Sequence, residues 1–430
     1  MKTILFLKFT IMGLESIFDF EVERLERENL LRFLPPYWVE YNVSRGTVEK
    51  DGEKKEVFIF CSNDYLGMTR RKEVAQEIIE GVLRYGSGSG AARLVSGNFK
   101  AHQEFEDFIR YFFELTKKGK DVLIFNSGWC ANVGVIPAIC GGVESAEIFS
   151  DELNHASIID GCRLSKVKVS VFRHRDCNHL ESLLSRSSAK LKLVVVDSIF
   201  SMDGDISPLK DIRFLCERYS ALFYVDEAHA FGIFGEKGKG ISDELGVEPD
   251  IALFTLSKAV GLYGAFLIAE KNLIKFLRSR ARSFIFSTSL PPFILSAAKK
   301  SIEIIGREGE RRRKVLENAS FLRNRLKEKG LSSFLTSFPV TTQITPFILG
   351  DSVLALSVSR ELFERGFFVQ AIRYPSVPRD KSRLRITVTS EHSREDIALF
   401  VEALADIMFH VKQGNFSYGK VERKNSEKMG

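Results

Sequence analysis

The sequence predicts an α/β fold: a large domain on a mostly parallel, seven-stranded sheet, followed by a smaller C-terminal α/β domain. First, the chain of 430 residues is long enough for two domains, and its composition, 44% hydrophobic and 27% charged, is ordinary for a globular protein. Second, short apolar runs alternate with helix-like or turn-rich segments from about residue 70 to 290. Such alternation is typical of parallel strands covered on both faces. Third, this alternation ends at Pro291 and Pro292, and a long helix-like stretch rich in Lys, Arg and Glu follows.

The first part of the chain, 1–60, is expected to hold a helix and a hairpin. Residues 13–34 are amphipathic, and residues 43–60 alternate around an Asp-Gly turn signal. Lys8 interrupts an apolar run that no small-residue cleavage site follows, so a signal peptide is disfavoured. One hypothesis is that translation begins at Met12 and that residues 1–11 are not native; a start at Met1 is the alternative. No uncharged apolar run is long enough to predict a membrane span.

Seven apolar runs predict the strands of the large domain, 61–290. They are residues 122–127, 147–150, 169–174, 191–198, 221–228, 251–257 and 264–270. In folds of this kind ligands bind beyond the carboxyl ends of the strands. Polar residues that directly follow these runs are therefore the first candidates for a functional site.

The smaller domain is expected over 291–412. Its predicted elements are a long helix-like stretch over roughly 293–330, strands within 342–350, 367–375 and 382–389, and a last helix over 394–411. The tail, 413–430, is polar and is predicted to be disordered.

Charge and cysteine content narrow the function classes. The net charge of +6 is spread along the chain, which argues against a nucleic-acid partner but suits an anionic substrate or an acidic carrier protein. The six cysteines form no CxxC pair, so neither a disulfide framework nor a metal site is expected. Reduced thiols favour a cytoplasmic protein.

Two charged residues end neighbouring strands of the predicted sheet. Asp226 ends one strand, with His229 shortly after it, and Lys258 ends the next. A strand-terminal acidic turn and a lysine that reaches solvent are the plain structural interpretations. The functional interpretation is a lysine that forms an imine with pyridoxal phosphate and an aspartate that pairs with the pyridinium nitrogen.

Three further segments support the functional interpretation. Ser127, Gly128 and Trp129 follow a strand and open a helix, a place where backbone N–H groups bind phosphate. His155 lies in another loop after a strand, where its ring could stack on a planar ligand or simply be structural. The glycine-rich residues 85–106 are either a flexible loop or a close cover over a ligand.

Between about residue 13 and residue 410 the chain resembles the α-oxoamine synthases, pyridoxal 5′-phosphate enzymes of transferase fold type I. Members join an amino acid to an acyl thioester and release carbon dioxide and the thiol. The motifs that carry the resemblance are SNDYLG, GSGSGAARLVSG, HQEFE, SGWCAN, NHASIIDG, FSMDGDISPL, VDEAHAFG, TLSKAVG and FSTSLPP. The chain departs from the usual family pattern at Trp129, Cys130, Asp197, Ala230 and Phe231.

The resemblance implies a role for each cofactor-site residue. Lys258 would hold the cofactor and move protons, Asp226 would pair with the ring nitrogen, and His155 would stack on the ring. The phenolic oxygen of the ring would meet His229. The phosphate would be bound by Gly128, Trp129 and Thr255, and by Ser287 and Thr288 of a neighbouring subunit, which implies a homodimer with shared sites.

The resemblance also suggests the substrates. Arg385 matches the arginine that grips the amino-acid carboxylate, although Arg383 lies two residues away on the same strand face. The segment VQAIRYPSVP resembles members that join L-alanine to a pimeloyl thioester, carried by coenzyme A or acyl carrier protein, in biotin synthesis. Arg373 in that segment is the candidate for acyl recognition, or else a solvent-facing arginine.

Rival hypotheses remain open at this point. They are a glycine-using acetyltransferase (2-amino-3-ketobutyrate ligase), a 5-aminolevulinate synthase, an aminotransferase of the same fold, and a catalytically silent scaffolding subunit of a heterodimer. The sequence does not show the side pocket that separates alanine from glycine.

Overall fold

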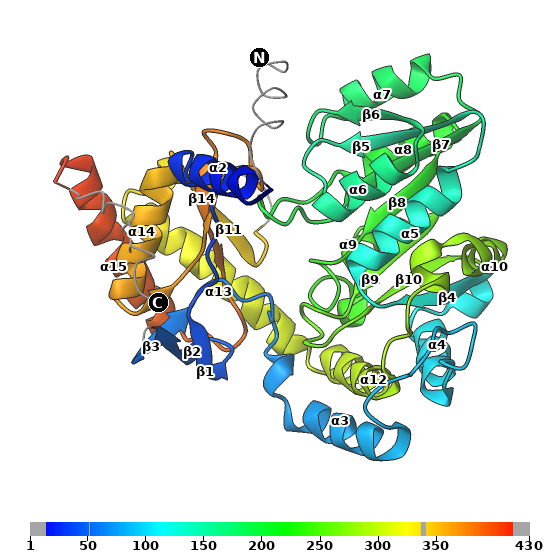
Figure 1. Ribbon diagram of the computed structural model, residues 1–430, viewed down its shortest axis with the longest axis horizontal. Coiled ribbons are helices and arrows are strands. Elements are labelled where there is room, and N and C mark those ends of the chain that lie inside the picture. The colour runs from blue at the N-terminus through cyan, green and yellow to red at the C-terminus, as the bar shows by residue number, and fades with distance from the viewer. Residues whose placement is uncertain (1–13, 51, 337–340, 416–430) are drawn as a thin grey trace.

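A computed structural model of the protein describes residues 14–50, 52–336 and 341–415 (Figure 1). Its centre is a seven-stranded sheet in the order β4-β10-β9-β8-β7-β5-β6. The strands are β4 (Lys120–Phe125), β5 (Ala146–Asp151), β6 (Lys168–Phe172), β7 (Leu191–Asp197), β8 (Leu222–Asp226), β9 (Ile251–Thr255) and β10 (Ala265–Glu270). Only β10 in this sheet runs antiparallel to its neighbours. The predicted mostly parallel sheet is confirmed.

Helices cover both faces of this sheet. One face carries α5 (Gly128–Cys140), α6 (Ala156–Leu164), α10 (Lys271–Arg280) and α11 (Arg282–Ile285). The other carries α4 (Lys100–Phe112), α7 (Cys177–Arg186), α8 (Leu209–Arg218) and α12 (Pro292–Arg307). Successive residues of β7 alternate between the faces: Leu193 and Val195 pack on one, Val194 and Val196 on the other. Both faces are buried, which explains why the strands are continuously apolar.

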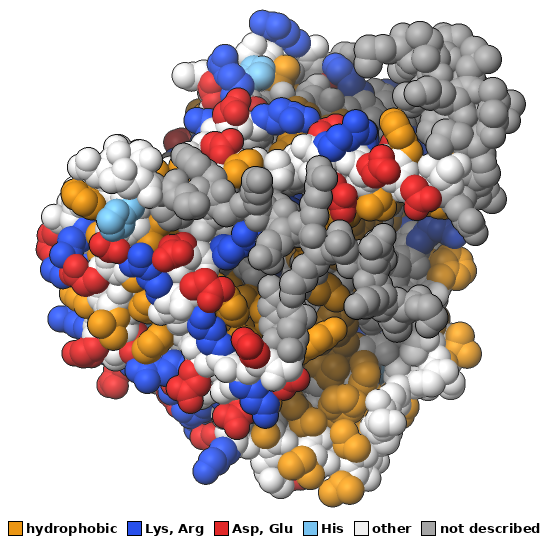
Figure 2. Space-filling view, turned by 60° about the vertical axis from the view of Figure 1, so that its left-hand side comes forward, with side chains coloured by type: hydrophobic (Ala, Val, Ile, Leu, Met, Phe, Trp, Pro, Cys, Tyr) orange, Lys and Arg blue, Asp and Glu red, His pale blue; other side chains and the backbone are white. Residues whose placement is uncertain are grey.

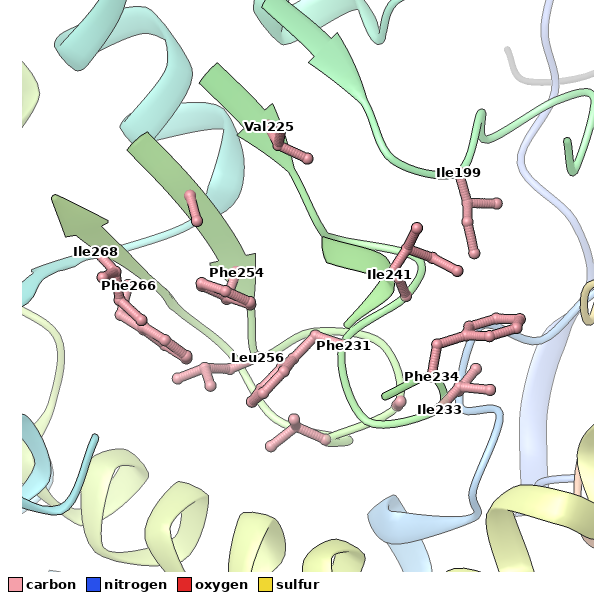
Figure 3. Packing of buried hydrophobic residues seen from close by; sticks show 14 of the residues in the cluster. Ile199, Val225, Phe231, Ile233, Phe234, Ile241, Phe254, Leu256, Phe266 and Ile268 are labelled. Carbon is pink, nitrogen blue, oxygen red and sulfur yellow. The ribbon is translucent and has the colours of Figure 1, made fainter. Parts of the chain in front are cut away.

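Phenylalanine rings pack among aliphatic side chains in the core on the α12 face (Figure 3). Phe254 and Phe266 stack with ring centroids 4.9 Å apart, and Phe231 packs edge-on against both. Phe231, in the segment VDEAHAFG, is one of the positions at which the chain departs from the usual family pattern, and its side chain is 2% exposed. This departure from the motif therefore extends the core beneath the loop that follows β8.

The N-terminal elements are α2 (Leu14–Arg27), β1 (Tyr37–Asn42), β2 (Arg45–Lys50) and β3 (Glu53–Ile59). The predicted hairpin is present as β2 and β3, and β1 adds a strand to it. The helix predicted to reach residue 34 ends at Arg27, because Asn29 has the left-handed conformation (φ 53°) that commonly ends helices. A fourth strand, β12 (Phe367–Phe368), pairs parallel with β3.

The C-terminal elements form a second core. The strands β11 (Ile344–Gly350), β14 (Ser382–Thr387) and β13 (Ala371–Ile372) make a three-stranded sheet in that order. Three helices pack on it: α13 (Gly309–Glu328), α14 (Ser352–Glu364) and α15 (Arg394–Lys412). The stretch 367–375, predicted as one strand, is divided between β12 and β13, which belong to different sheets.

The helix-like stretch predicted over roughly 293–330 is helical over most of its length, but it is divided into α12 and α13 (Gly309–Glu328). It is interrupted at Glu308, whose backbone (φ −89°, ψ 62°) is not helical, and Gly309 follows directly. The break lets α12 pack against α3 (Lys72–Tyr85) while α13 joins the C-terminal core. The remaining short helices are α9 (Ile241–Glu244) and the 3₁₀ turns Met68–Arg70, Leu115–Lys118, Glu236–Gly238 and Ser332–Phe334.

Several predictions about the chain ends lie outside the described residues: the nature of residues 1–11 and the order of the tail beyond residue 415. In the described ranges, no helix is both long and apolar enough to cross a membrane. The same ranges hold no cluster of three or more His, Cys, Asp or Glu side chains suited to a metal ion. On the face shown in Figure 2, acidic and basic side chains are interspersed.

Candidate active site

The carboxyl edge of the seven-stranded sheet gathers polar side chains from successive strands. Asp197 and Asp226 are the last residues of β7 and β8 and lie opposite each other in the parallel register. Thr255 ends β9, and Lys258 follows three residues later. His155 is the N-cap of α6, in the loop after β5. The strand-end placement predicted for these residues is therefore what the fold produces.

Asp226 is a buried carboxylate without a cationic partner. It is 4% exposed, and it accepts hydrogen bonds from Asn132 Nδ2 (2.9 Å) and from the backbone N–H of Ala228 (3.0 Å). Asn132 is fixed in turn by the hydroxyl of Tyr224. Among the described residues no ion pair reaches Asp226, although its charge acts on the nearby Lys258. Since a buried charge is costly unless it is paired, this site suits a positively charged ligand atom.

Lys258 presents an amine with no protein partner. Its side chain is half-buried, and no hydrogen bond joins its Nζ to any described residue. Burial lowers the pKa of Lys258; Asp226 opposes this shift, and Arg385 lowers the pKa further. A lysine amine that loses its proton easily is suited to attack a carbonyl and to act as a base.

His155 is held at the start of α6. Its backbone N–H donates to Asp197 Oδ2 (2.7 Å), and its Nδ1 lies 2.7 Å from Ser157 Oγ. Burial lowers the pKa of His155, against the opposing effect of Asp226. Trp129 approaches the imidazole edge-on, at 6.1 Å between centroids. A neutral, fixed imidazole beside Asp226 can stack on a flat ring.

Asp197 stands beside this histidine and was not among the predicted site residues. Burial, and then the charge of Asp226, raise the pKa of Asp197 well above its ordinary value. Two carboxylates at paired positions of adjacent strands disfavour each other's charged form. The sequence signal was present, since Asp197 precedes the FSMDGD motif, but its contact with His155 depends on the fold.

His229 is buried under the SNDYLG loop. Its Nδ1 lies 2.8 Å from the hydroxyl of Tyr65, and its backbone carbonyl accepts from Gln343 Nε2 (2.7 Å). Burial, with the nearby charge of Lys258, lowers the pKa of His229 well below its ordinary value. Tyr65 and Asn63 join the site through this loop, and both were missed as individual residues although their motif was recognised.

The N-terminus of α5 forms the candidate phosphate cradle. Ser127 caps the helix by accepting the backbone N–H of Cys130 at 3.1 Å. The backbone N–H groups of Gly128 and Trp129 have no hydrogen-bond partner among the described residues. A Cβ built on Gly128 would meet nothing closer than Thr255, at 3.8 Å. Free amides and an open approach at a helix N-terminus fit a phosphate group.

Two arginines of β14 have different environments. Arg385 donates from Nε to the carbonyl of Ser201 (2.6 Å) and from Nη1 to Asn63 Oδ1 (3.1 Å), and its charge influences Lys258. Arg383 instead forms an ion pair with Asp203 at 2.5 Å. The geometry therefore brings Arg385, rather than Arg383, to the candidate site.

The remaining predicted residues, Arg373, Ser287 and Thr288, form hydrogen bonds with other segments of the chain. Arg373 is 9% exposed and donates to the backbone carbonyls of Asn29 (2.8 Å) and Leu31 (2.7 Å), so it is not the solvent-facing arginine of the plain alternative. Ser287 Oγ and the carbonyl of Thr288 accept hydrogen bonds from the Asn126 amide of the same chain. Their contribution to a neighbouring subunit remains a prediction.

The chain is similar to known proteins over most of its length. The family model for aminotransferase class I and II matches residues 55–404. The 8-amino-7-oxononanoate synthase of Thermoanaerobacter pseudethanolicus is 41% identical over 358 residues, covering 82% of this chain and 88% of that protein. The enzyme of the same name from Geobacter sulfurreducens is 42% identical over 360 residues, covering 83% of this chain and 90% of that protein.

Solved structures are also similar to this chain over most of its length. The serine palmitoyltransferase of Sphingomonas wittichii superposes with a TM-score of 0.85 at 29% identity, covering 94% of this chain and all (100%) of that one. A serine palmitoyltransferase from S. paucimobilis, solved with bound PLP–myriocin, gives a TM-score of 0.85 at 28% identity, with the same coverage of 94% and 100%. The 8-amino-7-oxononanoate synthase of Francisella tularensis gives 0.70 at 26% identity, covering 83% of this chain and 99% of that one.

Proposed function

Because the chain belongs to the aminotransferase class I and II family, alongside the 8-amino-7-oxononanoate synthases, we propose that it condenses L-alanine with a pimeloyl thioester. The products are 8-amino-7-oxononanoate, carbon dioxide and the free thiol, and the reaction belongs to biotin synthesis. The observation that carries the proposal is the meeting of an unpaired carboxylate, Asp226, with an unpartnered amine, Lys258, beside the Arg385 guanidinium. These three groups match an amino-acid substrate bound to a cationic ring.

Pyridoxal 5′-phosphate is the cofactor of this enzyme. Its phosphate fits the free amides of Gly128 and Trp129 and the hydroxyl of Thr255, and its ring nitrogen fits Asp226. When bound, the cofactor withdraws electrons from the α-carbon of the amino acid, so that the bonds at this carbon break more easily.

Lys258 has two tasks in this site. Its Nζ is the attachment point for the cofactor, and it takes and returns the proton of the amino acid's α-carbon. Burial favours the uncharged amine, which is the form that accepts a proton. A carboxylate such as Asp226 at the ring nitrogen would favour the protonated form of that nitrogen.

Two histidines hold the ring in place. His155 is fixed through its backbone by Asp197 and offers a flat, neutral face. His229 has its Nδ1 against the hydroxyl of Tyr65, so its Nε2 is left to meet the phenolic oxygen of the ring. Both contacts orient the ring without adding positive charge near Lys258.

Arg385 binds the carboxylate of the amino acid. Its Nε is bonded to the Ser201 carbonyl, its Nη1 to Asn63 Oδ1 and its Nη2 to the Tyr65 hydroxyl, so the guanidinium is held in place while each Nη group keeps one N–H for a carboxylate. Arg383 is neutralised by Asp203 and is not needed for this contact. The geometry therefore favours Arg385 over Arg383 as the residue that binds the amino-acid carboxylate.

The proposal also covers recognition of the acyl substrate and assembly into a homodimer. Arg373 remains the candidate for the far end of the acyl chain, through the Nη group that does not bond the backbone of residues 29–31. We place Ser287 and Thr288 of the partner subunit at the phosphate, in a homodimer. All six cysteines are free, which supports a cytoplasmic location.

The test is a titration of the cofactor-loaded protein with L-alanine, glycine and L-serine, followed by absorbance. Tightest saturation with alanine, and turnover with pimeloyl-CoA or pimeloyl acyl carrier protein, are expected. Saturation with glycine alone would move the assignment to a glycine-using member. A protein that takes up no pyridoxal phosphate would contradict the proposal and favour a silent subunit.

A further inference from the structure

His174, in the turn after β6, has a carboxylate at each ring nitrogen. Its Nδ1 lies 2.9 Å from Asp151 Oδ1, and its Nε2 lies 2.7 Å from Asp205 Oδ2. A neutral imidazole carries one N–H group, whereas the protonated ring carries two. Both hydrogen bonds to ionised carboxylates are therefore made only by the charged form of His174.

The surroundings of this histidine favour that charge. Asp151 and Asp205 are 1% and 0% exposed in their side chains, and Arg175 Nη1 lies 3.3 Å from Asp205 Oδ2. Buried carboxylates need positive partners, and two cations here face two anions. Glu152 also approaches, but it accepts the backbone N–H of His174 rather than a ring proton. Burial alone would lower the pKa of His174, yet the bonds to both aspartates outweigh it and raise the pKa to about 9.

Asp205 belongs to the loop of residues 198–207, which follows β7 and precedes α8. The loop is closed by backbone hydrogen bonds from Ser207 to Ser198 and from Phe200 to the Asp205 carbonyl. The ring of Phe200 also packs edge-on against His174, with centroids 4.4 Å apart. His174 therefore holds the base of the loop through one charged contact and one aromatic contact.

The tip of the same loop touches the arginines of β14. Ser201 receives the Nε–H of Arg385 on its carbonyl oxygen, and Asp203 pairs with Arg383. The loop is thus a continuous link between His174 and the guanidinium at the candidate site. The Ser201 carbonyl is one of the contacts that orient Arg385, together with Asn63 Oδ1 (3.1 Å) and the Tyr65 hydroxyl (3.4 Å).

We propose that His174 is a positioning residue for amino-acid binding, which acts through Asp205 and the 198–207 loop to aim Arg385 at the substrate carboxylate. The inference rests on the proposed function, because it takes Arg385 as the carboxylate-binding group. His174 itself does not touch the substrate.

The test uses the holoenzyme and measures the dissociation constants of L-alanine and glycine from cofactor absorbance, together with the KM of the pimeloyl thioester. In His174→Gln we expect both amino acids to bind roughly 3- to 30-fold more weakly, by the same factor because they share the carboxylate. The cofactor absorbance and the thioester KM should stay as in the parent protein. Unchanged amino-acid affinity in folded His174→Gln would overturn the inference.

Asp205→Asn is the second variant, in case the first does not fold. It should weaken alanine binding as well, and in the double variant the loss should not exceed the larger single loss, because both act through one contact. Unchanged affinity in Asp205→Asn, or fully additive losses, would overturn the inference. His179→Gln is the matched control: its ring accepts the backbone N–H of Arg173, within the same turn and helix, and affinity should not change.

Arg385→Lys distinguishes a failure of the inference about His174 from a failure of the role proposed for Arg385. If it weakens alanine binding while His174→Gln does not, the inference fails and the proposed function stands. If Arg385→Lys leaves alanine binding unchanged, the role of Arg385 fails, and the inference fails with it.

Discussion

The cofactor side and the substrate side of the candidate site are built in different ways. On the cofactor side, Asp226 and Thr255 are the last residues of neighbouring parallel strands, and Lys258 follows one of them. On the substrate side, Arg383 and Arg385 lie two residues apart on β14, yet one pairs with Asp203 and the other reaches Asn63. On the cofactor side, residues at the ends of adjacent parallel strands come together because these ends meet at the same edge of the sheet. On the second side, loop partners from the large domain decide which arginine is available.

The largest effect should come from the cofactor side. In Lys258→Ala the attachment point and the proton-transferring amine are both lost, so turnover should fall by at least about 10³-fold. The absorbance band of the cofactor bonded to lysine should disappear. Lys275→Ala, an exposed lysine of α10, is the control and should keep both. Substantial turnover in Lys258→Ala would remove the lysine from the mechanism.

A pair of matched variants tests which arginine of β14 binds the carboxylate of the amino acid. Arg385→Lys loses the two-pronged carboxylate contact, so the KM for alanine should rise roughly 10- to 100-fold. Arg383→Lys keeps a cation beside Asp203 and should give a clearly smaller rise. Steady-state kinetics at saturating thioester measures both. A larger rise in Arg383→Lys would exchange the roles of the two arginines.

The pH dependence of stability tests the charge on the substrate side. Burial lowers the pKa of His174, but its aspartate partners raise it from the ordinary 6.5 to about 9, so its stabilising effect is complete below pH 6.5. That effect is lost as the pH rises through about 9, and it should amount to on the order of 3 kcal/mol. Urea unfolding of the parent protein and of His174→Gln should therefore differ at pH 6.5 and converge near pH 10. A constant difference would mean that His174 does not titrate in this range.

The smallest effect is expected at Arg373. Arg373→Gln removes two hydrogen bonds to the carbonyls of Asn29 and Leu31, so the free energy of unfolding should fall by about 1–2 kcal/mol. The KM of the thioester decides its second role: an increase supports acyl recognition, and no change restricts Arg373 to holding the N-terminal segment. Arg379→Gln, an exposed arginine of the same loop, is the control.

The sequence could predict most of the cofactor side because its signals are local. Parallel strands that end in a polar residue place it at one edge of the sheet, as with Asp226 and Thr255. The contacts of Arg373 with residues 29–31 and of His174 with Asp205 join distant segments, and no pattern in a single sequence records them. The interruption at Glu308 was missed because helix-like residues continue on both sides, and the packing of α12 and α13 in separate cores decides it.

The pairing of β12 with β3 bears on how the protein is made. The strands β1 to β3 leave the ribosome early, but the strand that completes their sheet, Phe367–Phe368, lies near the other end of the chain. All seven strands of the central sheet, by contrast, are synthesised between Lys120 and Glu270. Domains tend to fold as units during synthesis. The central sheet can thus form on the nascent chain, whereas the N-terminal sheet has an unpaired edge at β3 until synthesis is almost finished.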